Sequence, residues 1–272
     1  MHRAMAFAIM IATAPTLAAA GQRDLENCAN PALSASETVN FCQKALRDRS
    51  LEPTTRAQIL VNVGVALAEM GRHSDAVNNY ALARDTNPQL LPAYTNRARS
   101  NEALGRPDEA LADYAGAIAA DPGWVDAWAG RGALLLRHDR ADQAVGDLTQ
   151  ALELDGSDIA VRFNRGVAYL RIGDPARAKS DFDRIITDKP GDAGAYLNRG
   201  RARAQLDDAG AQADFDRALE LSPEWGWGHF IRGRYHDGQK REEAANRDYL
   251  RAFELGYSEP WLLERVRRIS GS

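Results

Sequence analysis

Small and bulky apolar residues recur along this chain at a nearly constant interval. One alanine recurs with successive separations of 34, 34, 34, 33 and 34 residues: Ala76, Ala110, Ala144, Ala178, Ala211 and Ala245. Four residues after it stands a bulky apolar residue: Tyr80, Tyr114, Leu148, Phe182, Phe215 and Tyr249. A spacing of four residues puts both positions on one face of a helix. The interval therefore predicts one small helical unit that is repeated and stacked on itself.

Each unit also carries a small residue earlier in its sequence. Twelve residues before the alanine, or eleven in the fifth copy, stand Gly64, Ala98, Gly132, Gly166, Gly200 and Gly233. A Pro or Gly closes each unit: Pro88, Pro122, Gly156, Pro190, Pro223 and Gly256. Small residues allow two helices to approach closely, and the bulky side chain fills the space between neighbours. We therefore expect each unit to be a pair of helices joined by a turn.

This pattern resembles the tetratricopeptide repeat (TPR) family, in which a helix, a turn and a second helix repeat every 34 residues. The six copies span residues 57–90, 91–124, 125–158, 159–192, 193–225 and 226–259. The resemblance implies an all-α, right-handed α-solenoid with a cap at each end. It also implies a surface that holds another molecule, although the fold hosts many unrelated binding roles.

The first twenty residues have the pattern of a cleavable signal peptide. Arg3 supplies a positive charge, residues 4–14 are apolar, and three alanines (18–20) precede Gly21. An apolar stretch of this length is too short to cross a bilayer as a helix, although a membrane anchor or a buried helix remains the alternative. The short, alanine-rich leader looks bacterial. We expect cleavage after Ala20 and a periplasmic or secreted protein, with no membrane span in the mature chain.

Residues 21–56 contain both cysteines of the chain, Cys28 and Cys42. In an exported protein an even pair of cysteines indicates a disulfide. Since the end of a solenoid exposes a face that the next repeat would cover, we expect this segment to form an N-terminal cap, with helices near 22–29 and 36–48 tied by the disulfide. The alternative is two independent buried thiols.

The C-terminal residues 260–272 have the pattern of an amphipathic helix. Its apolar stripe consists of Trp261, Leu262, Leu263, Val266 and Ile269. We expect this helix to cap the last repeat. The alternative is an amphipathic tail that binds a partner.

Charges repeat with the same period. Five copies carry Arg just before the small residue: Arg97, Arg131, Arg165, Arg199 and Arg232. The same five carry Asp just before the bulky residue: Asp113, Asp147, Asp181, Asp214 and Asp248. The first copy has Val63 and Asn79 instead, so the two charges are present and absent together. They indicate an Arg–Asp pair that links helices within a repeat or between adjacent repeats. The alternative is a basic strip for an acidic ligand.

In TPR proteins the first helix of each repeat lines a concave groove. In peptide-binding relatives the asparagine before the Arg points into it, and its amide bonds to the ligand backbone. The matching residues here are Asn62, Asn96, Asn164 and Asn198. The third and sixth copies have Gly130 and Ile231 at this position. An amide both donates and accepts, so this series could hold an extended chain. The alternative is that each amide bonds to neighbouring helices or faces water.

Helical spacing puts further residues on the same face. The apolar ones are Phe163, Leu197, Phe230 and Trp227, and the basic ones are Arg99, Arg171, Arg201 and Arg234. Aromatic and arginine side chains dominate binding hot spots. We therefore expect the later half of the groove to bind a peptide with apolar side chains and a carboxylate. The alternative for the aromatic residues is packing between repeats.

The net charge of −4 comes without a block of basic residues, which argues against general nucleic-acid binding. The five histidines lack zinc-type spacing, and the sequence has no phosphate-binding loop and no nucleophile elbow. We therefore expect no metal, no cofactor and no catalysis. The predicted function is that of an exported scaffold that binds a protein or peptide. The resemblance suggests cell-envelope enzymes or secretion components as partner classes. Alternatives are self-assembly through the outer face and an enzyme with a cryptic site.

Overall fold

A computed structural model describes residues 19–270 and contains fifteen α-helices and no strand in that range. The chain forms two compact units, and each is described by itself. The first unit extends to His138 and includes residues 153–155, and the second contains residues 139–152 and everything from Gly156 onward. The all-α fold expected from the sequence is confirmed.

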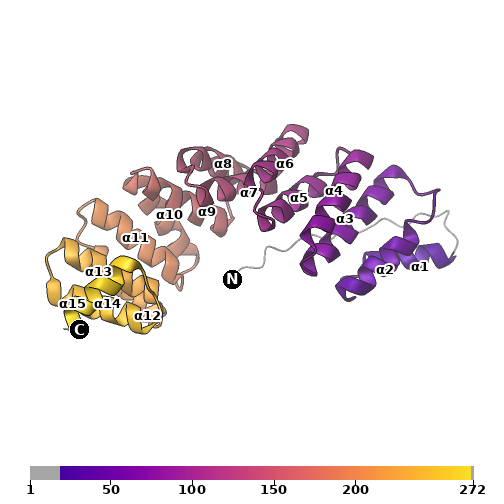
Figure 1. Cartoon of the computed structure of the whole chain (residues 1–272). Coiled ribbons are helices and arrows are strands. Elements are labelled where there is room, and N and C mark those ends of the chain that lie inside the picture. Colours follow the sequence, from indigo (N-terminus) through magenta and orange to yellow (C-terminus); the bar gives the residue numbers. More distant parts are fainter. Residues whose placement is uncertain (1–18, 271–272) are drawn as a thin grey trace. The chain divides into compact units, whose positions relative to one another are not determined.

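The first unit holds the N-terminal segment and the first repeats. Its helices, drawn in indigo to magenta in Figure 1, are α1 (Ala19–Cys28), α2 (Ala35–Ala45), α3 (Pro53–Glu69), α4 (His73–Thr86), α5 (Leu91–Ala103), α6 (Pro107–Ala120) and α7 (Val125–Arg137). Each helix packs on the next one along the chain. The alternate helices α3, α5 and α7 also touch, so the first helices of successive repeats form one face of this unit.

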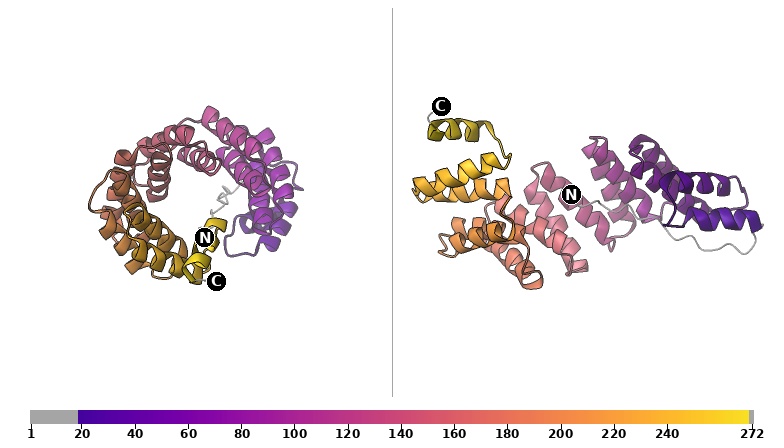
Figure 2. Two further views of the ribbon diagram at one scale, coloured as in Figure 1. Left: turned by 60° about the vertical axis from the view of Figure 1, so that its left-hand side comes forward. Right: turned by 90° about the horizontal axis from the view of Figure 1, so that it is seen from below.

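The second unit holds the later repeats and the C-terminal helix. Its helices are α8 (Ala141–Leu154), whose last two residues belong to the first unit, α9 (Ile159–Arg171), α10 (Pro175–Asp188), α11 (Ala193–Gln205), α12 (Ala211–Leu221), α13 (Gly226–Gly238), α14 (Glu242–Glu254) and α15 (Pro260–Ser270). From α9 onward each helix packs on the next, and Figure 2 shows the helices stacked side by side. The first helices α9 and α11 touch as well.

The recurring small residue of the first helix and the recurring bulky residue of the second helix meet within each repeat. A Cβ atom added to Gly64 would clash with the ring of Tyr80, and one added to Gly166 would lie 2.7 Å from Cζ of Phe182. Tyr80 and Phe182 are fully buried. The side chain of the second helix therefore packs directly on the backbone of the first helix. The prediction that the small residue allows the two helices to approach closely is therefore confirmed.

The turn between the two helices of a repeat requires a residue in the left-handed backbone conformation, with positive φ. Glycine supplies it in three repeats, at Gly71, Gly105 and Gly173, with φ between 70° and 76°. The other three repeats use Asp139, Asp207 and Lys240, with φ between 54° and 56°. Glycine adopts this conformation without a steric penalty, and aspartate tolerates it better than most residues.

The structure joins Cys28 and Cys42 in a disulfide, with Cα atoms 4.7 Å apart. The bridge links the end of α1 to α2, and both cysteines are buried in a core shared with Ile59 and Val63 of α3. The N-terminal segment thus covers the first repeat. The predicted leader lies outside the described residues, except for Ala19 and Ala20, where α1 begins.

Reduction of this disulfide is expected to lower the free energy of unfolding by about 3 kcal/mol, because a short closed loop restricts the unfolded chain by roughly that amount. Urea unfolding of oxidised protein, reduced protein and the Cys28→Ser/Cys42→Ser variant measures the effect. Thiol counting on the oxidised, denatured chain is the control. Two reactive thiols in that sample, or identical unfolding curves, would contradict the prediction.

The C-terminal helix α15 packs on the last repeat. Leu262 and Val266 are buried together with Phe230 and Tyr249. Trp261 is 43% exposed and lies edge-on to Tyr249, with ring centroids 5.1 Å apart. No helix among residues 19–270 is long and apolar enough to cross a membrane.

Arg–Asp pairs join the helices, as the sequence predicts. Within single units the pairs are Arg97–Asp113, Arg165–Asp181, Arg199–Asp214 and Arg232–Asp248. Two of these arginines also reach the second helix of the preceding repeat: Arg199 donates to Asp183 and Arg232 to Asp216, both over 2.8 Å. Each arginine side chain therefore occupies the space between its own second helix and the preceding one. These ion pairs explain why Arg and Asp recur together, and no basic strip for an acidic ligand is needed to explain them.

The sixth repeat adds two histidines to this arrangement. His229 Nδ1 lies 3.2 Å from Asp248 Oδ1, and His236 Nε2 lies 3.7 Å from Asp248 Oδ2. Burial lowers the pKa of His236 below its ordinary value of 6.5. In the second repeat the equivalent residue is Asn101, whose amide donates to Asp113 over 3.0 Å. His236 is thus a titratable replacement for an amide.

Acidification below about pH 6.5 is expected to destabilise the second unit through His236. Because the folded state holds the lower pKa, the unfolded chain takes up the proton first, so stability falls as the pH drops. Thermal unfolding between about pH 7 and pH 5 measures this in the wild type and in His236→Asn, which copies Asn101. The variant should show the weaker dependence on pH. Parallel pH profiles would contradict the role of His236.

Candidate functional site

Three arginines lie on the first helices of the second unit: Arg171 at the end of α9, Arg201 in α11 and Arg234 in α13. We call them the arginine cluster. Aspartates start two of these helices. Oδ1 of Asp158 accepts hydrogen bonds from the backbone N–H groups of Ala160 and Val161, and Oδ1 of Asp192 accepts one from Ala195. These N-caps fix where α9 and α11 begin, and hence the positions of Arg171 and Arg201 along their helices.

Arg201 stands at the centre of this cluster. It is half-buried, and its Nη1 donates to Oδ1 of Asn198 over 2.8 Å. Its guanidinium carbon lies 5.8 Å from the ring centroid of Trp227 on α13, within reach of a cation–π interaction. Arg201 makes no ion pair with a carboxylate of residues 19–270. A half-buried cation is therefore held by one amide and one aromatic ring.

The charges of two neighbouring arginines act on Arg201. The pKa of Arg201 is lowered by its burial and then by the positive charges of Arg171 and Arg234. Arg171 pairs with Asp139, whose side chain is 92% exposed, over 3.0 Å. Arg234 is exposed and forms no ion pair within the described part of the chain. An anion placed beside Arg201 would relieve this repulsion.

The predicted asparagine series divides into two kinds of residue. Asn62, Asn96 and Asn198 are buried, so their side chains belong to the interior. Nδ2 of Asn198 donates to the carbonyl of Gly194 over 2.9 Å, and Nδ2 of Asn62 lies 3.4 Å from the carbonyl of Cys28. These amides serve the helices, which is the alternative that the sequence left open. Asn164 differs, since it is half-buried and its amide has no hydrogen bond within residues 19–270.

The apolar residues predicted for the groove also divide. Leu197 and Phe230 are 0% and 4% exposed, so their side chains form core instead of lining an open surface. Phe163 is half-buried and packs edge-on to Phe182, with ring centroids 5.6 Å apart. Trp227 is half-buried beside Trp225, with ring centroids 5.4 Å apart, and presents its ring to Arg201. Of the four, Trp227 adjoins the arginine cluster.

Arg99 lies in the first unit and is not part of the cluster. Its Nη1 donates to Oδ1 of Asn96 over 3.3 Å, which repeats the contact between Arg201 and Asn198. The described residues contain no group of His, Cys, Asp or Glu side chains suited to a metal ion. The arrangement on the second unit can bind an anion next to an aromatic ring. Asp139 was missed at the sequence level, because it stands in a turn 32 residues before Arg171.

A family model described as tetratricopeptide repeat matches residues 61–123, 95–159 and 163–224. These matches cover more than half of the chain, which therefore belongs to the TPR family. The fold is one that serves protein–protein interaction. No curated protein sequence matches the chain significantly.

Several solved structures resemble the chain in fold. A tetratricopeptide repeat protein from Parabacteroides merdae is 22% identical over 86% of this chain and 91% of its own, with a TM-score of 0.61. PilF of Pseudomonas aeruginosa is 17% identical over 81% and 100%, with a TM-score of 0.64. YrrB, described as a TPR protein with an unusual peptide-binding site, is 19% identical over 68% and 96%, with a TM-score of 0.55. At these identities the likeness concerns the fold.

Proposed function

We propose that this protein is a non-catalytic scaffold that binds a peptide or protein partner on the face formed by α9, α11 and α13, where the partner places a carboxylate against Arg201. The observation that carries the proposal is the half-buried position of Arg201, which has no carboxylate partner among the described residues and lies between two other arginines. Burial and the neighbouring like charges both oppose the charged form of this side chain. An incoming anion supplies the missing partner.

The residues around Arg201 suit a peptide. The ring of Trp227 offers apolar surface next to the carboxylate site. Asn164 lies on the neighbouring first helix α9, and its amide can donate to and accept from a peptide backbone. Asn198 is committed to Gly194 and Arg201, so its role is to orient the guanidinium. The precedent of a peptide-binding TPR protein, YrrB, is consistent with this use of the fold.

A matched pair of peptide libraries tests the proposal. Both contain fluorescent peptides without internal Asp or Glu, and they differ in carrying a free or an amidated C-terminus. Anisotropy titrations of the full chain are expected to find binders in the free-carboxylate library whose amidated twins bind at least roughly tenfold more weakly, the value of one charge-assisted hydrogen bond. Absence of binders, or equal binding of both forms, would refute the carboxylate site.

We also propose that the protein acts outside the cytoplasm. The support is the leader pattern of residues 1–20 together with a pair of cysteines placed to form a disulfide. N-terminal sequencing of protein recovered from the periplasm or medium of a bacterial host is expected to begin at Gly21. An uncleaved chain found only in the cytoplasm would contradict export.

A further inference from the structure

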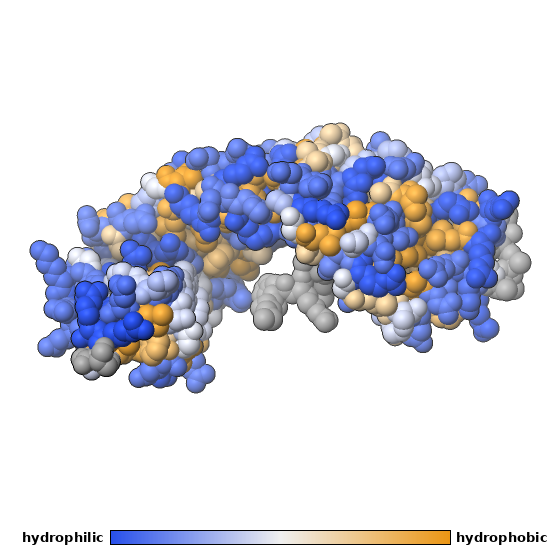
Figure 3. All heavy atoms as spheres, viewed as in Figure 1, coloured by the Kyte–Doolittle hydropathy of each residue, from blue (hydrophilic) through white to orange (hydrophobic). Residues whose placement is uncertain are grey.

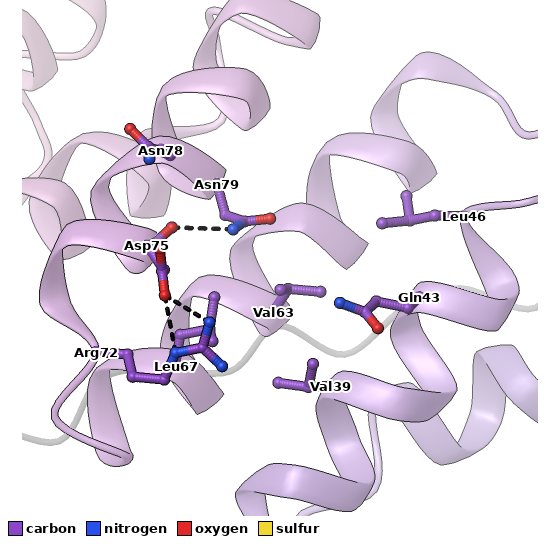
Figure 4. A pocket seen from close by; sticks show the side chains of 9 residues that line it. All are labelled: Val39, Gln43, Leu46, Val63, Leu67, Arg72, Asp75, Asn78 and Asn79. Atoms are coloured by element: carbon purple, nitrogen blue, oxygen red, sulfur yellow. Dashed lines mark hydrogen bonds and ion pairs between the residues drawn. The ribbon is translucent and has the colours of Figure 1, made fainter.

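The first unit contains a cavity that is separate from the arginine cluster. It lies among α2, α3 and α4 and has a volume of about 340 Å³. Val39, Leu46, Val63 and Leu67 form its apolar part (Figure 4). The space-filling view shows hydrophobic residues at the surface of this end of the molecule, in the region of these helices (Figure 3).

The cavity stands where later repeats hold an arginine side chain. Arg199 lies between its own second helix, through Asp214, and the preceding one, through Asp183. Arg232 is placed in the same way. In the first repeat the corresponding first helix is α3, its second helix is α4 and the preceding helix is α2. The same three kinds of element therefore surround the cavity.

Two substitutions explain why this space is empty in the first repeat. Val63 takes the place of the arginine, and Asn79 takes the place of its aspartate. Valine is too short to fill the volume that an arginine stem and guanidinium occupy elsewhere. The cavity is thus a vacated arginine position that opens to the outside.

The polar rim of the cavity consists of the Arg72–Asp75 ion pair and the amides of Gln43, Asn78 and Asn79. Asp75 pairs with Arg72 through Oδ2 alone, and Oδ1 accepts no hydrogen bond from residues 19–270. The side chains of this pair are 47% and 54% exposed, so it is easily exchanged. Nδ2 of Asn79 donates to the backbone carbonyl of Asp75, which leaves Oδ1 of Asn79 without a donor in the described region. Gln43 adds a further amide (Figure 4).

We propose that this cavity binds the side chain of an arginine carried by a partner protein. An arginine has an apolar stem that matches the valine and leucine walls, and its guanidinium carries five N–H donors. The carboxylate of Asp75 supplies the opposite charge, and the oxygens of Asn79 and Gln43 accept further hydrogen bonds. The partner residue would occupy the position that Arg199 and Arg232 hold within the chain.

Methyl NMR of the full chain tests this assignment with N-butylguanidinium as the probe. Saturable shifts are expected at the methyl groups of Val39, Val63 and Leu67. The probes n-butylammonium and n-butanol, at the same concentrations, are expected to bind more weakly. Equal shifts from butylammonium would overturn the assignment to arginine, and equal shifts from butanol, or no saturable shift, would overturn the site.

Two variants and one control complete the test. Asp75→Asn should weaken N-butylguanidinium binding roughly tenfold, the value of a charge-assisted hydrogen bond. Val63→Arg/Asn79→Asp restores the pair of the later repeats and should abolish binding. Asp85→Asn is the control, because Asp85 lies on the same helix, is 63% exposed and pairs with its neighbour Arg84. Wild-type affinity in Asp75→Asn, or a loss equal to that of Asp85→Asn, would contradict the site even if the double variant fails to fold.

Discussion

Asp214→Ala is expected to lower the free energy of unfolding by about 3–5 kcal/mol, the cost of breaking a buried ion pair from one side. Asp214 is 3% exposed and accepts hydrogen bonds from Nε and Nη2 of Arg199 over 2.8 and 2.6 Å. Nη1 of Arg203 lies 3.0 Å from the same carboxylate. Removal of Asp214 leaves two largely buried guanidinium groups without their main acceptor.

The control for this prediction is Asp216→Ala on the same helix. Asp216 is 45% exposed, and its partner Arg232 keeps the hydrogen bonds to Asp248. The expected loss is at most about 1 kcal/mol, as for exposed ion pairs. Urea unfolding followed by far-UV circular dichroism compares the two variants, with the whole curve fitted because repeats can unfold separately. Similar losses for Asp214→Ala and Asp216→Ala would contradict the structural role of the buried pairs.

Arg201→Gln is expected to weaken binding of a carboxylate-bearing peptide by roughly 10- to 100-fold, because it removes the charged donor while keeping a polar side chain. The same change should leave the unfolding midpoint nearly unchanged or raise it. Arg201 has no carboxylate partner in the described chain, and both burial and the charges of Arg171 and Arg234 lower its pKa. A residue whose removal harms binding and spares stability is one that the fold does not need for itself.

Arg247→Gln is the matched control for this second prediction. Arg247 is an exposed arginine on α14, outside the cluster. Its replacement removes the same net charge and should leave peptide affinity within about twofold, since exposed distant charges are screened by salt. Anisotropy titrations with one selected peptide give both affinities. An equal loss in the two variants would mean that net charge, and not the cluster, attracts the peptide.

The repeat period was enough to predict the architecture, because the same local packing contact recurs in every repeat. A small residue on the first helix must meet a bulky side chain on the second, as Gly64 meets Tyr80 and Gly166 meets Phe182. The Arg–Asp pairs could also be predicted, since both residues recur with the same period. The sequence pattern did not predict the additional hydrogen bonds of Arg199 and Arg232 to the preceding repeat.

The site was foreseen in part, for a geometric reason. Helical spacing put Arg171, Arg201 and Arg234 on the first helices, where they lie. It also put Leu197 and Phe230 on that face, although neighbouring helices bury both of them. Phe230 is covered by Tyr257 and Trp261, and Trp261 belongs to the capping helix that follows the last repeat. Adjacent residues on a helix point in different directions, so one can be buried and the next exposed. Spacing alone does not show which of the two positions the neighbouring helices cover.

The cavity in the first unit shows the opposite case. The sequence already marked Val63 and Asn79 as departures from the repeated pair. Their consequence depends on how closely α2 approaches α3 and α4, because a closer helix would have filled the volume. That distance is a property of the tertiary packing of the N-terminal cap, which the repeat pattern does not describe.

The most direct test of the central claim is a thermodynamic cycle between Arg201 and the carboxylate of one bound peptide. Calorimetric titrations measure four affinities, with wild type and Arg201→Gln each binding the free and the amidated peptide. The account predicts that amidation weakens binding to the wild type and changes binding to Arg201→Gln very little, because the two changes remove the same interaction. Losses that simply add in the doubly altered complex would show that Arg201 and the carboxylate do not meet.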